Sequence, residues 1–148
     1  MRIRGTLLAV PLLLATTAVN ASEYGSPEEA RAMLMSTVEQ MKANKDQTIT
    51  QINEGQIMDR DLYPYCADAD GQFTAHPVEQ VRAMNLKELE DKEGKAFGEE
   101  IYEKAEEGEI AEVEYMWTRP GEDEPVQKVA YVTKVDDQVC GVGYYEEQ

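Results

Sequence analysis

Apolar positions at helical spacing mark the first predicted element. Ser26 is a typical N-cap, Pro27 suits the first helical position, and Glu29 completes a capping box. Apolar side chains then follow at helical intervals, at Ala30, Leu34, Val38, Met41, Ile49 and Ile52. The pattern predicts one long amphipathic helix that ends near Gly55, with its weakest point at Lys45, where the apolar stripe lapses and a kink could fall.

The next part of the chain alternates short apolar runs with turn residues. Residues 62–67 and 73–76 are rich in aromatic and apolar side chains, and the Asp-Ala-Asp-Gly sequence between them predicts the turn of a hairpin. Pro64 cannot donate a ladder hydrogen bond, which favours an edge strand or a bulge near the start of the first run. A short helix is expected where Phe97, Ile101 and Ala105 follow one another at helical spacing.

From Glu109 onward the hydrophobic period changes to two. Residues 111–117 place Ala, Val, Tyr and Trp on one face and Glu, Glu and Met on the other, as in a half-buried antiparallel strand. Residues 126–135 and 138–145 predict two further strands after a Pro-Gly turn. The order predicts an α+β domain, in which the long N-terminal helix and the shorter helix pack on one face of a five-stranded antiparallel sheet.

Residues 1–21 differ from the rest of the chain. They contain two arginines, an apolar stretch from Thr6 to Val19 and a small-residue ending, Val-Asn-Ala. This pattern predicts a secretory signal peptide, so we expect residues 22–148 to form a soluble periplasmic or secreted protein; an uncleaved N-terminal anchor is the alternative. The mature part has about 127 residues, the size of one domain.

The charge balance narrows the class of partner. Without Arg2 and Arg4 the chain has 12 basic against 30 acidic residues, a formal charge of −18, which argues against nucleic acid or an anionic membrane surface as a partner. The acidic residues are dispersed, which indicates a solvated surface. Adaptation to high salt is one form that such a surface could take, because salt screens the repulsion between like charges.

The sequence contains no signature of an enzyme, a metal site or a cofactor site. It has one His and lacks a nucleophile elbow and a Gly-rich phosphate loop. The Asp68–Gly71 sequence resembles the start of a calcium loop, but His76 and Pro77 interrupt it before a twelfth-position ligand, so a hairpin turn explains it better. Cys66 and Cys140 are too few for structural zinc; a disulfide and two buried thiols both remain open.

One lysine stands out because it follows an aromatic strand. Tyr115 and Trp117 share a face, and Lys128 is expected near Trp117 across the hairpin. A buried lysine needs an anion, and a small carboxylate would supply one. The alternative is that Lys128 points outward and pairs with a surface glutamate while Trp117 belongs to the core.

Several motifs of this chain, taken in order, resemble the single Cache type 2 group of small-molecule-sensing domains. The resemblance runs from about Ser26 to Tyr145. The matching residues are Tyr63 and Tyr65 before Asp68 and Gly71, His76-Pro77, Asp91 to Gly94 before Phe97, Tyr115 and Trp117 before Pro120-Gly121, Lys128 and Tyr131, and Gly141 and Gly143 before Tyr145.

The resemblance implies a PAS-like Cache fold with a ligand pocket between the sheet and its connecting segment, and binding of small organic acids such as acetate, propionate, pyruvate or lactate. It implies a ligand-binding set of Tyr63, His76, Trp117, Lys128 and Tyr131. The aromatic face shared with Trp117 adds Tyr115, and charge reasoning adds Arg60. Lys128, helped by Arg60 or His76, would hold the carboxylate, tyrosine hydroxyls would orient it, and Trp117 would bound its tail. Lys128 and Tyr131 are an odd number of residues apart, so they share one pocket only if a bulge or strand end intervenes.

Two functions from different classes fit these observations. The first is an exported, non-enzymatic sensor or ligand-binding module for a small carboxylate, with an unidentified membrane receptor or sensor partner. The second is a structural or protein-interaction domain of the same fold that binds no small molecule. Homodimerisation through the long helix is open in both cases.

Overall fold

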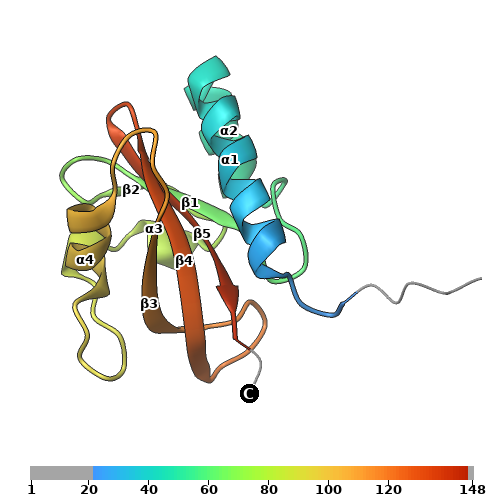
Figure 1. Ribbon diagram of the computed structural model, residues 1–148, viewed down its shortest axis with the longest axis vertical. Helices are drawn as coiled ribbons and strands as arrows, with labels where there is room; N and C mark the ends of the chain where they lie inside the picture. The colour runs from blue at the N-terminus through green and yellow to red at the C-terminus, as the bar shows by residue number, and fades with distance from the viewer. Residues whose placement is uncertain (1–21, 147–148) are drawn as a thin grey trace, which may run out of the picture.

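An antiparallel sheet forms the centre of the computed structural model, which describes residues 22–146 (Figure 1). The predicted signal peptide lies outside the described residues. The five strands lie in the order β2-β1-β5-β4-β3. They are β1 (Pro64–Ala67), β2 (Phe73–Ala75), β3 (Ala111–Thr118), β4 (Pro125–Val135) and β5 (Gln138–Tyr145); the helices are α1 (Pro27–Ala43), α2 (Lys45–Asn53), α3 (Glu79–Arg82), the 3₁₀ turn η1 (Leu86–Glu88) and α4 (Phe97–Lys104). This confirms the predicted α+β class and the five-stranded sheet.

The predicted single N-terminal helix is two helices, α1 and α2. The capping box at the start of α1 is present, since Ser26 Oγ accepts from the backbone N–H of Glu29 and the Glu29 carboxylate accepts from that of Ser26. Asn44 leaves the helical conformation, with φ −158°, and its side chain caps α2 by accepting from the backbone N–H of Gln47. The break therefore falls one residue before Lys45, because Asn44 acts as an N-cap within the periodic segment.

Helices cover both faces of the sheet, which corrects the prediction that they pack on one. Figure 1 shows α1 and α2 on one side of the sheet and α4 on the other. The first side packs Leu34, Met41 and Ile52 against the sheet, and the second packs Leu86, Phe97 and Ile101 against it. Successive residues 129–132 of β4 are all buried, as a strand covered on both faces requires.

Strand β1 is an interior strand, so of the two alternatives expected from Pro64, an edge strand or a bulge, the edge strand is wrong. β1 pairs with β2 on one side and with β5 on the other. Pro64 is tolerated because it is the first residue of the strand, and the pairing with β2 shifts register between Cys66 and Ala67.

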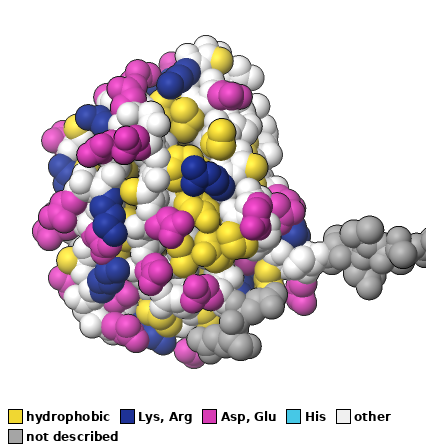
Figure 2. All heavy atoms as spheres, in the orientation of Figure 1, with side chains coloured by type: hydrophobic (Ala, Val, Ile, Leu, Met, Phe, Trp, Pro, Cys, Tyr) yellow, Lys and Arg dark blue, Asp and Glu magenta, His cyan; other side chains and the backbone are white. Residues whose placement is uncertain are grey.

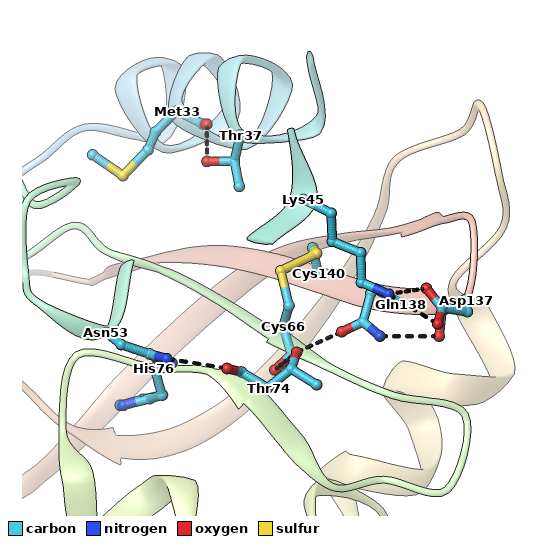
Figure 3. The surroundings of a disulfide bond; sticks show 10 residues. All are labelled: Met33, Thr37, Lys45, Asn53, Cys66, Thr74, His76, Asp137, Gln138 and Cys140. Atoms are coloured by element: carbon cyan, nitrogen blue, oxygen red, sulfur yellow. Dashed lines mark hydrogen bonds and ion pairs between the residues drawn. A yellow bond between two sulfur atoms is a disulfide. The ribbon is translucent and has the colours of Figure 1, made fainter. Parts of the chain in front are cut away.

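A disulfide joins β1 to β5 at the centre of the sheet. Cys66 and Cys140 lie directly opposite each other in the antiparallel register and are bonded through their sulfur atoms. Figure 3 shows the bond beneath α1, with Thr74 of β2 hydrogen-bonded to Gln138 of β5 nearby. Of the two alternatives that the sequence left open, the structure contains the disulfide.

The surface agrees with a solvated, acidic exterior. On the face drawn in Figure 2, Asp and Glu side chains are scattered among basic and uncharged residues. Within residues 22–146, no helix is both long enough and apolar enough to cross a bilayer.

Candidate functional site

The side chain of Lys128 is buried in a cage of four tyrosines. Only 1% of the residue is exposed. Its Nζ donates a hydrogen bond to Tyr63 Oη at 3.0 Å, and it lies 4.4 Å from the ring centroid of Tyr63, 5.1 Å from that of Tyr145 and 5.7 Å from those of Tyr65 and Tyr115. Among the described residues no carboxylate lies within ion-pair distance of this Nζ. The cage stabilises a cation without neutralising it.

Strand register brings these side chains together. Lys128 of β4 lies opposite Tyr115 of β3 on one side and opposite Tyr145 of β5 on the other. The predicted cross-strand neighbour, Trp117, instead lies opposite Val126. Strand β3 ends at Thr118, where the loop to β4 begins. Lys128 therefore pairs with Tyr115, which lies two residues further from this loop than Trp117.

Two glycines of β5 form the floor of the cage. A Cβ on Gly143 would lie 2.4 Å from Cε of Lys128, and a Cβ on Gly141 would lie 2.5 Å from Cζ and Oη of Tyr65. The two positions share a face of β5, since they are two residues apart. The Gly-x-Gly-x-Tyr sequence thus leaves room for Lys128 and Tyr65 to lie flat against the strand.

Two of the four cage hydroxyl groups, those of Tyr63 and Tyr145, form a hydrogen-bonded chain. Tyr63 Oη lies 3.2 Å from Tyr145 Oη, and Tyr145 Oη donates to the carbonyl oxygen of Thr118 at 2.9 Å. The buried hydroxyl of Tyr65 has no hydrogen-bond partner among the described residues. Burial raises the pKa of Tyr65, Tyr115 and Tyr145, so these phenols stay protonated near neutral pH.

His76 borders the cage as a neutral ring. Its backbone N–H donates to the side-chain oxygen of Asn53 at the end of α2, which lies beside β2 in Figure 3. Its Nδ1 accepts from the backbone N–H of Val78 at 3.0 Å, and its ring centroid lies 5.1 Å from that of Tyr63. Burial, followed by the nearby charge of Lys128, lowers the pKa of His76 to about 3. His76 can therefore offer a ligand its Nε2–H, but not the positive charge considered for it from the sequence.

We expect His76 to make the fold acid-sensitive. Its folded pKa of about 3 lies below the ordinary value of 6.5, so the unfolded chain takes up this proton first as the pH falls. Stability from this source is complete above pH 6.5 and should fall by about 2 kcal/mol between pH 6.5 and 5.

Denaturant unfolding at these two pH values, for the wild-type protein and His76→Asn, measures this contribution. The carboxylates titrate alike in both proteins over this pH interval, so the two proteins differ only in the contribution of His76. The variant should therefore lose less stability than the wild-type protein. Equal losses in the two proteins would contradict the assignment.

The space inside the cage is small. The cavity has a volume of about 20 Å³, room for roughly one water molecule. Apolar side chains complete its wall, with the ring of Phe97 stacked 3.9 Å from that of Tyr115 and Trp117 edge-on to Phe97. A larger depression of about 330 Å³ shares Tyr63, His76, Val81 and Trp117 with this cavity. These shared residues separate the cage from the larger depression.

Five of the seven residues proposed from the sequence line this cavity: Tyr63, His76, Tyr115, Trp117 and Lys128. Arg60 does not, because it lies in a turn with φ +57° and pairs with Asp59 and Glu29 near the start of α1. Tyr131 does not either. The β3–β4 register is unbroken, so Tyr131 points to the α1 side of the sheet, where Arg31 lies 5.8 Å from its ring centroid.

Sequence reasoning missed the contribution of Tyr65 and Tyr145 to the cage. Both stand in the motifs that carry the family resemblance, but neither was assigned to the pocket. The glycines two and four residues before Tyr145 are the signal that could have placed it, because small residues on one face of a strand mark a close approach.

A buried ion pair lies beside the cage. Arg119 is 9% exposed, its Nε donates to Asp61 Oδ2 at 3.2 Å, and its guanidinium lies 3.9 Å from the ring centroid of Tyr24 and 5.3 Å from that of Tyr145. Asp61 Oδ1 accepts from the backbone N–H of Gly25 at 2.7 Å. The pair thus connects the segment before α1 to the end of β3. No cluster of three potential metal ligands occurs within residues 22–146.

Residues 13–148 match the family described as Single Cache domain 2. The chain belongs to this family. Cache domains are sensory modules of receptors that bind small-molecule ligands, and they typically have no enzymatic activity.

Solved structures share the fold. A methyl-accepting chemotaxis protein from Vibrio parahaemolyticus RIMD 2210633 is 22% identical, with a TM-score of 0.61, over 80% of this chain and 86% of that one. A Cache chemosensory domain solved for its carboxylic acid recognition is 20% identical, with a TM-score of 0.63, over 81% and 92%. A periplasmic sensor domain of a chemotaxis protein is 23% identical, with a TM-score of 0.60, over 81% and 90%. No curated protein matches the chain.

Proposed function

We propose that this Cache domain binds a small organic acid of the acetate, propionate, pyruvate or lactate class, with the carboxylate held by Lys128. The observation that carries the proposal is the buried ammonium group without an acidic partner among the described residues. An ammonium group has three N–H donors, and this one makes a single hydrogen bond, to Tyr63 Oη. A ligand carboxylate would supply the missing charge and acceptors.

The relative whose structure concerns carboxylic acid recognition supports the ligand class by analogy. The cavity of about 20 Å³ is too small even for acetate, so binding requires side chains of the cavity wall to move. The half-buried side chains of Trp117 and Leu89 on its wall are the ones that can give way at least cost. The ligand would then enter from the depression that shares Trp117.

The substitution Lys128→Met tests the proposal. Short monocarboxylates at millimolar concentration should raise the melting temperature of the wild-type protein, and the variant should lose about 2 kcal/mol of binding free energy, roughly thirtyfold in affinity. The ligand-free variant should itself be more stable, by about 1 kcal/mol, because a buried unpaired charge is replaced by an apolar side chain of similar length.

Lys134→Met is the matched control, since Lys134 is an exposed lysine of the same strand. It should change neither the melting temperature nor the response to acids. A response that survives in Lys128→Met would show that the acid binds elsewhere.

The second candidate function is a protein-interaction domain without a small-molecule ligand. The small cavity favours it, because the cage is nearly filled by its own side chains. A flat melting response of the wild-type protein across the whole acid panel would support this candidate.

The proposal includes action outside the cytoplasm. It rests on the signal-peptide pattern of residues 1–21. N-terminal sequencing of the protein from an extracytoplasmic fraction should show a first residue near Ser22. A receptor partner is part of the same proposal, because Cache domains belong to receptors. Homodimerisation through the N-terminal helices stays a prediction from the sequence.

A further inference from the structure

The depression of about 330 Å³ beside the cage is large enough to hold part of a ligand. Its volume falls in the range of small-molecule sites, about 300–1,000 Å³, whereas the cage has room for roughly one water molecule. The two spaces share the side chains of Tyr63, His76, Val81 and Trp117 as a common wall. A ligand held at Lys128 can therefore extend into the depression once the half-buried Trp117 gives way.

Apolar side chains line much of the depression. Met58 follows α2, Val78 directly precedes α3, and Pro120 lies in the β3–β4 loop. Met58 and Val78 are two of the four large hydrophobic side chains that are exposed among the described residues. The other two, Met35 and Met84, do not line the depression. Apolar side chains that gather in one concavity indicate a binding surface, whereas single exposed ones need no explanation.

Polar groups at the β3–β4 end of the depression are already paired with protein atoms. Arg119 Nε donates to Asp61, and its Nη1 lies 3.4 Å from a carboxylate oxygen of Glu122. The carbonyl oxygen of Thr118 accepts from Tyr145. These groups offer little to a polar substituent of a ligand, and the carboxylates that neutralise Arg119 would repel a second ligand carboxylate. The depression is therefore suited to a hydrocarbon chain.

The thickness of the shared wall sets the length of chain that reaches the depression. Because the same side chains line both spaces, the wall is one side chain thick, roughly 5 Å on the scale of packed aromatic rings. An extended chain advances about 1.2 Å per bond, since three backbone bonds span about 3.6 Å. About four carbons cross the wall, and the carbons beyond these enter the depression.

We infer that the depression is a subsite for an apolar ligand tail, and that the domain binds straight-chain monocarboxylates of about six to eight carbons more tightly than acetate or propionate. The inference rests on the proposed function, since the carboxylate must bind at Lys128. Val78 and Met58, whose flexible thioether side chain adapts its shape, would cover the tail. Each methylene group buried there should raise the affinity roughly fourfold.

Titration calorimetry with propionate, butanoate, hexanoate and octanoate tests the inference. Octanoate should bind at least about thirtyfold more tightly than butanoate, because its four added methylene groups lie in the depression and are at least partly buried there. Octanedioate has the same length but ends in a second carboxylate. It should bind at least about tenfold more weakly than octanoate, because that carboxylate would lie among apolar side chains and near Glu122.

The double substitution Met58→Gln/Val78→Thr makes the depression polar at nearly unchanged side-chain volume. It should lower the affinity for octanoate about tenfold and change that for propionate by less than about twofold. Both side chains are exposed, so the ligand-free melting temperature should stay close to that of the wild-type protein. Met84→Gln is the matched control, because Met84 is 42% exposed against 38% for Met58 but lies outside the depression.

The outcomes separate the inference from the proposed function. A preference for long chains that is lost in Met58→Gln/Val78→Thr and kept in Met84→Gln supports the inference. If octanoate binds no more tightly than butanoate, or if the two variants behave alike, the inference fails while carboxylate binding at Lys128 stands. If no acid binds to the wild-type protein, or if Lys128→Met binds octanoate as tightly as the wild-type protein does, both fail.

Discussion

Replacing both cysteines by alanine, in Cys66→Ala/Cys140→Ala, should destabilise the fold by about 4 kcal/mol. The two residues are 74 positions apart, so the bond constrains a long loop of the unfolded chain. Loss of the buried sulfur atoms from the α1 side of the sheet adds to the effect. Because domains of this size are stable by about 5–15 kcal/mol, the variant should keep only a fraction of its stability.

Urea unfolding of the two proteins, with and without a reducing agent, measures the contribution. The oxidised wild-type protein should lose stability on reduction, while the double variant should be insensitive to the reducing agent. A double variant as stable as the oxidised protein would contradict the expectation. The bond also ties β1 to β5, whose opposite face forms the cage, so the variant should bind ligands more weakly as well.

Replacing the buried aspartate in Asp61→Ala should destabilise the fold by about 3 kcal/mol. The substitution removes the partner of Arg119 Nε and the acceptor of the Gly25 N–H. Removing one member of a buried ion pair leaves the other charge without compensation. Glu122, 3.4 Å from Arg119, is more exposed and replaces only part of the interaction.

Asp59→Ala is the matched control. Asp59 is an aspartate two residues away whose ion pair with Arg60 is largely exposed, so its loss should change stability by less than about 1 kcal/mol. The double substitution Asp61→Ala/Arg119→Met should recover part of the stability, since neither charge is then left alone. An Asp61→Ala variant no less stable than Asp59→Ala would show that the pair does not hold the N-terminal segment.

The structure confirmed the predicted features that depend on neighbouring residues. The N-cap at Ser26, the turn at Asp68–Gly71 and the alternation of β3 are local, because each is set by side chains within a few positions of one another. Asn44 is the local signal that the prediction overlooked, since an Asn within a periodic segment can end one helix and begin the next.

The candidate site was predictable in part, because alternation along a strand decides which side chains share a face. That rule already set Lys128 and Tyr131 apart, and the structure places them on opposite sides of the sheet. Arg60 was assigned from charge alone, and charge does not report position. Two carboxylates hold it by ion pairs, that of the adjacent residue Asp59 and that of Glu29, which lies 31 residues earlier in the chain.

Hydrophobic period and turn chemistry act over short distances along the chain, so they were enough to predict the class of the fold and the faces of the strands, while motifs taken in order carried the family resemblance. The folded sheet was needed to show that β1 and β5 are neighbours, that Cys66 meets Cys140, and that four tyrosines surround Lys128. These contacts join residues far apart in the chain. They depend on strand order and register, which are fixed by the packing of the whole sheet.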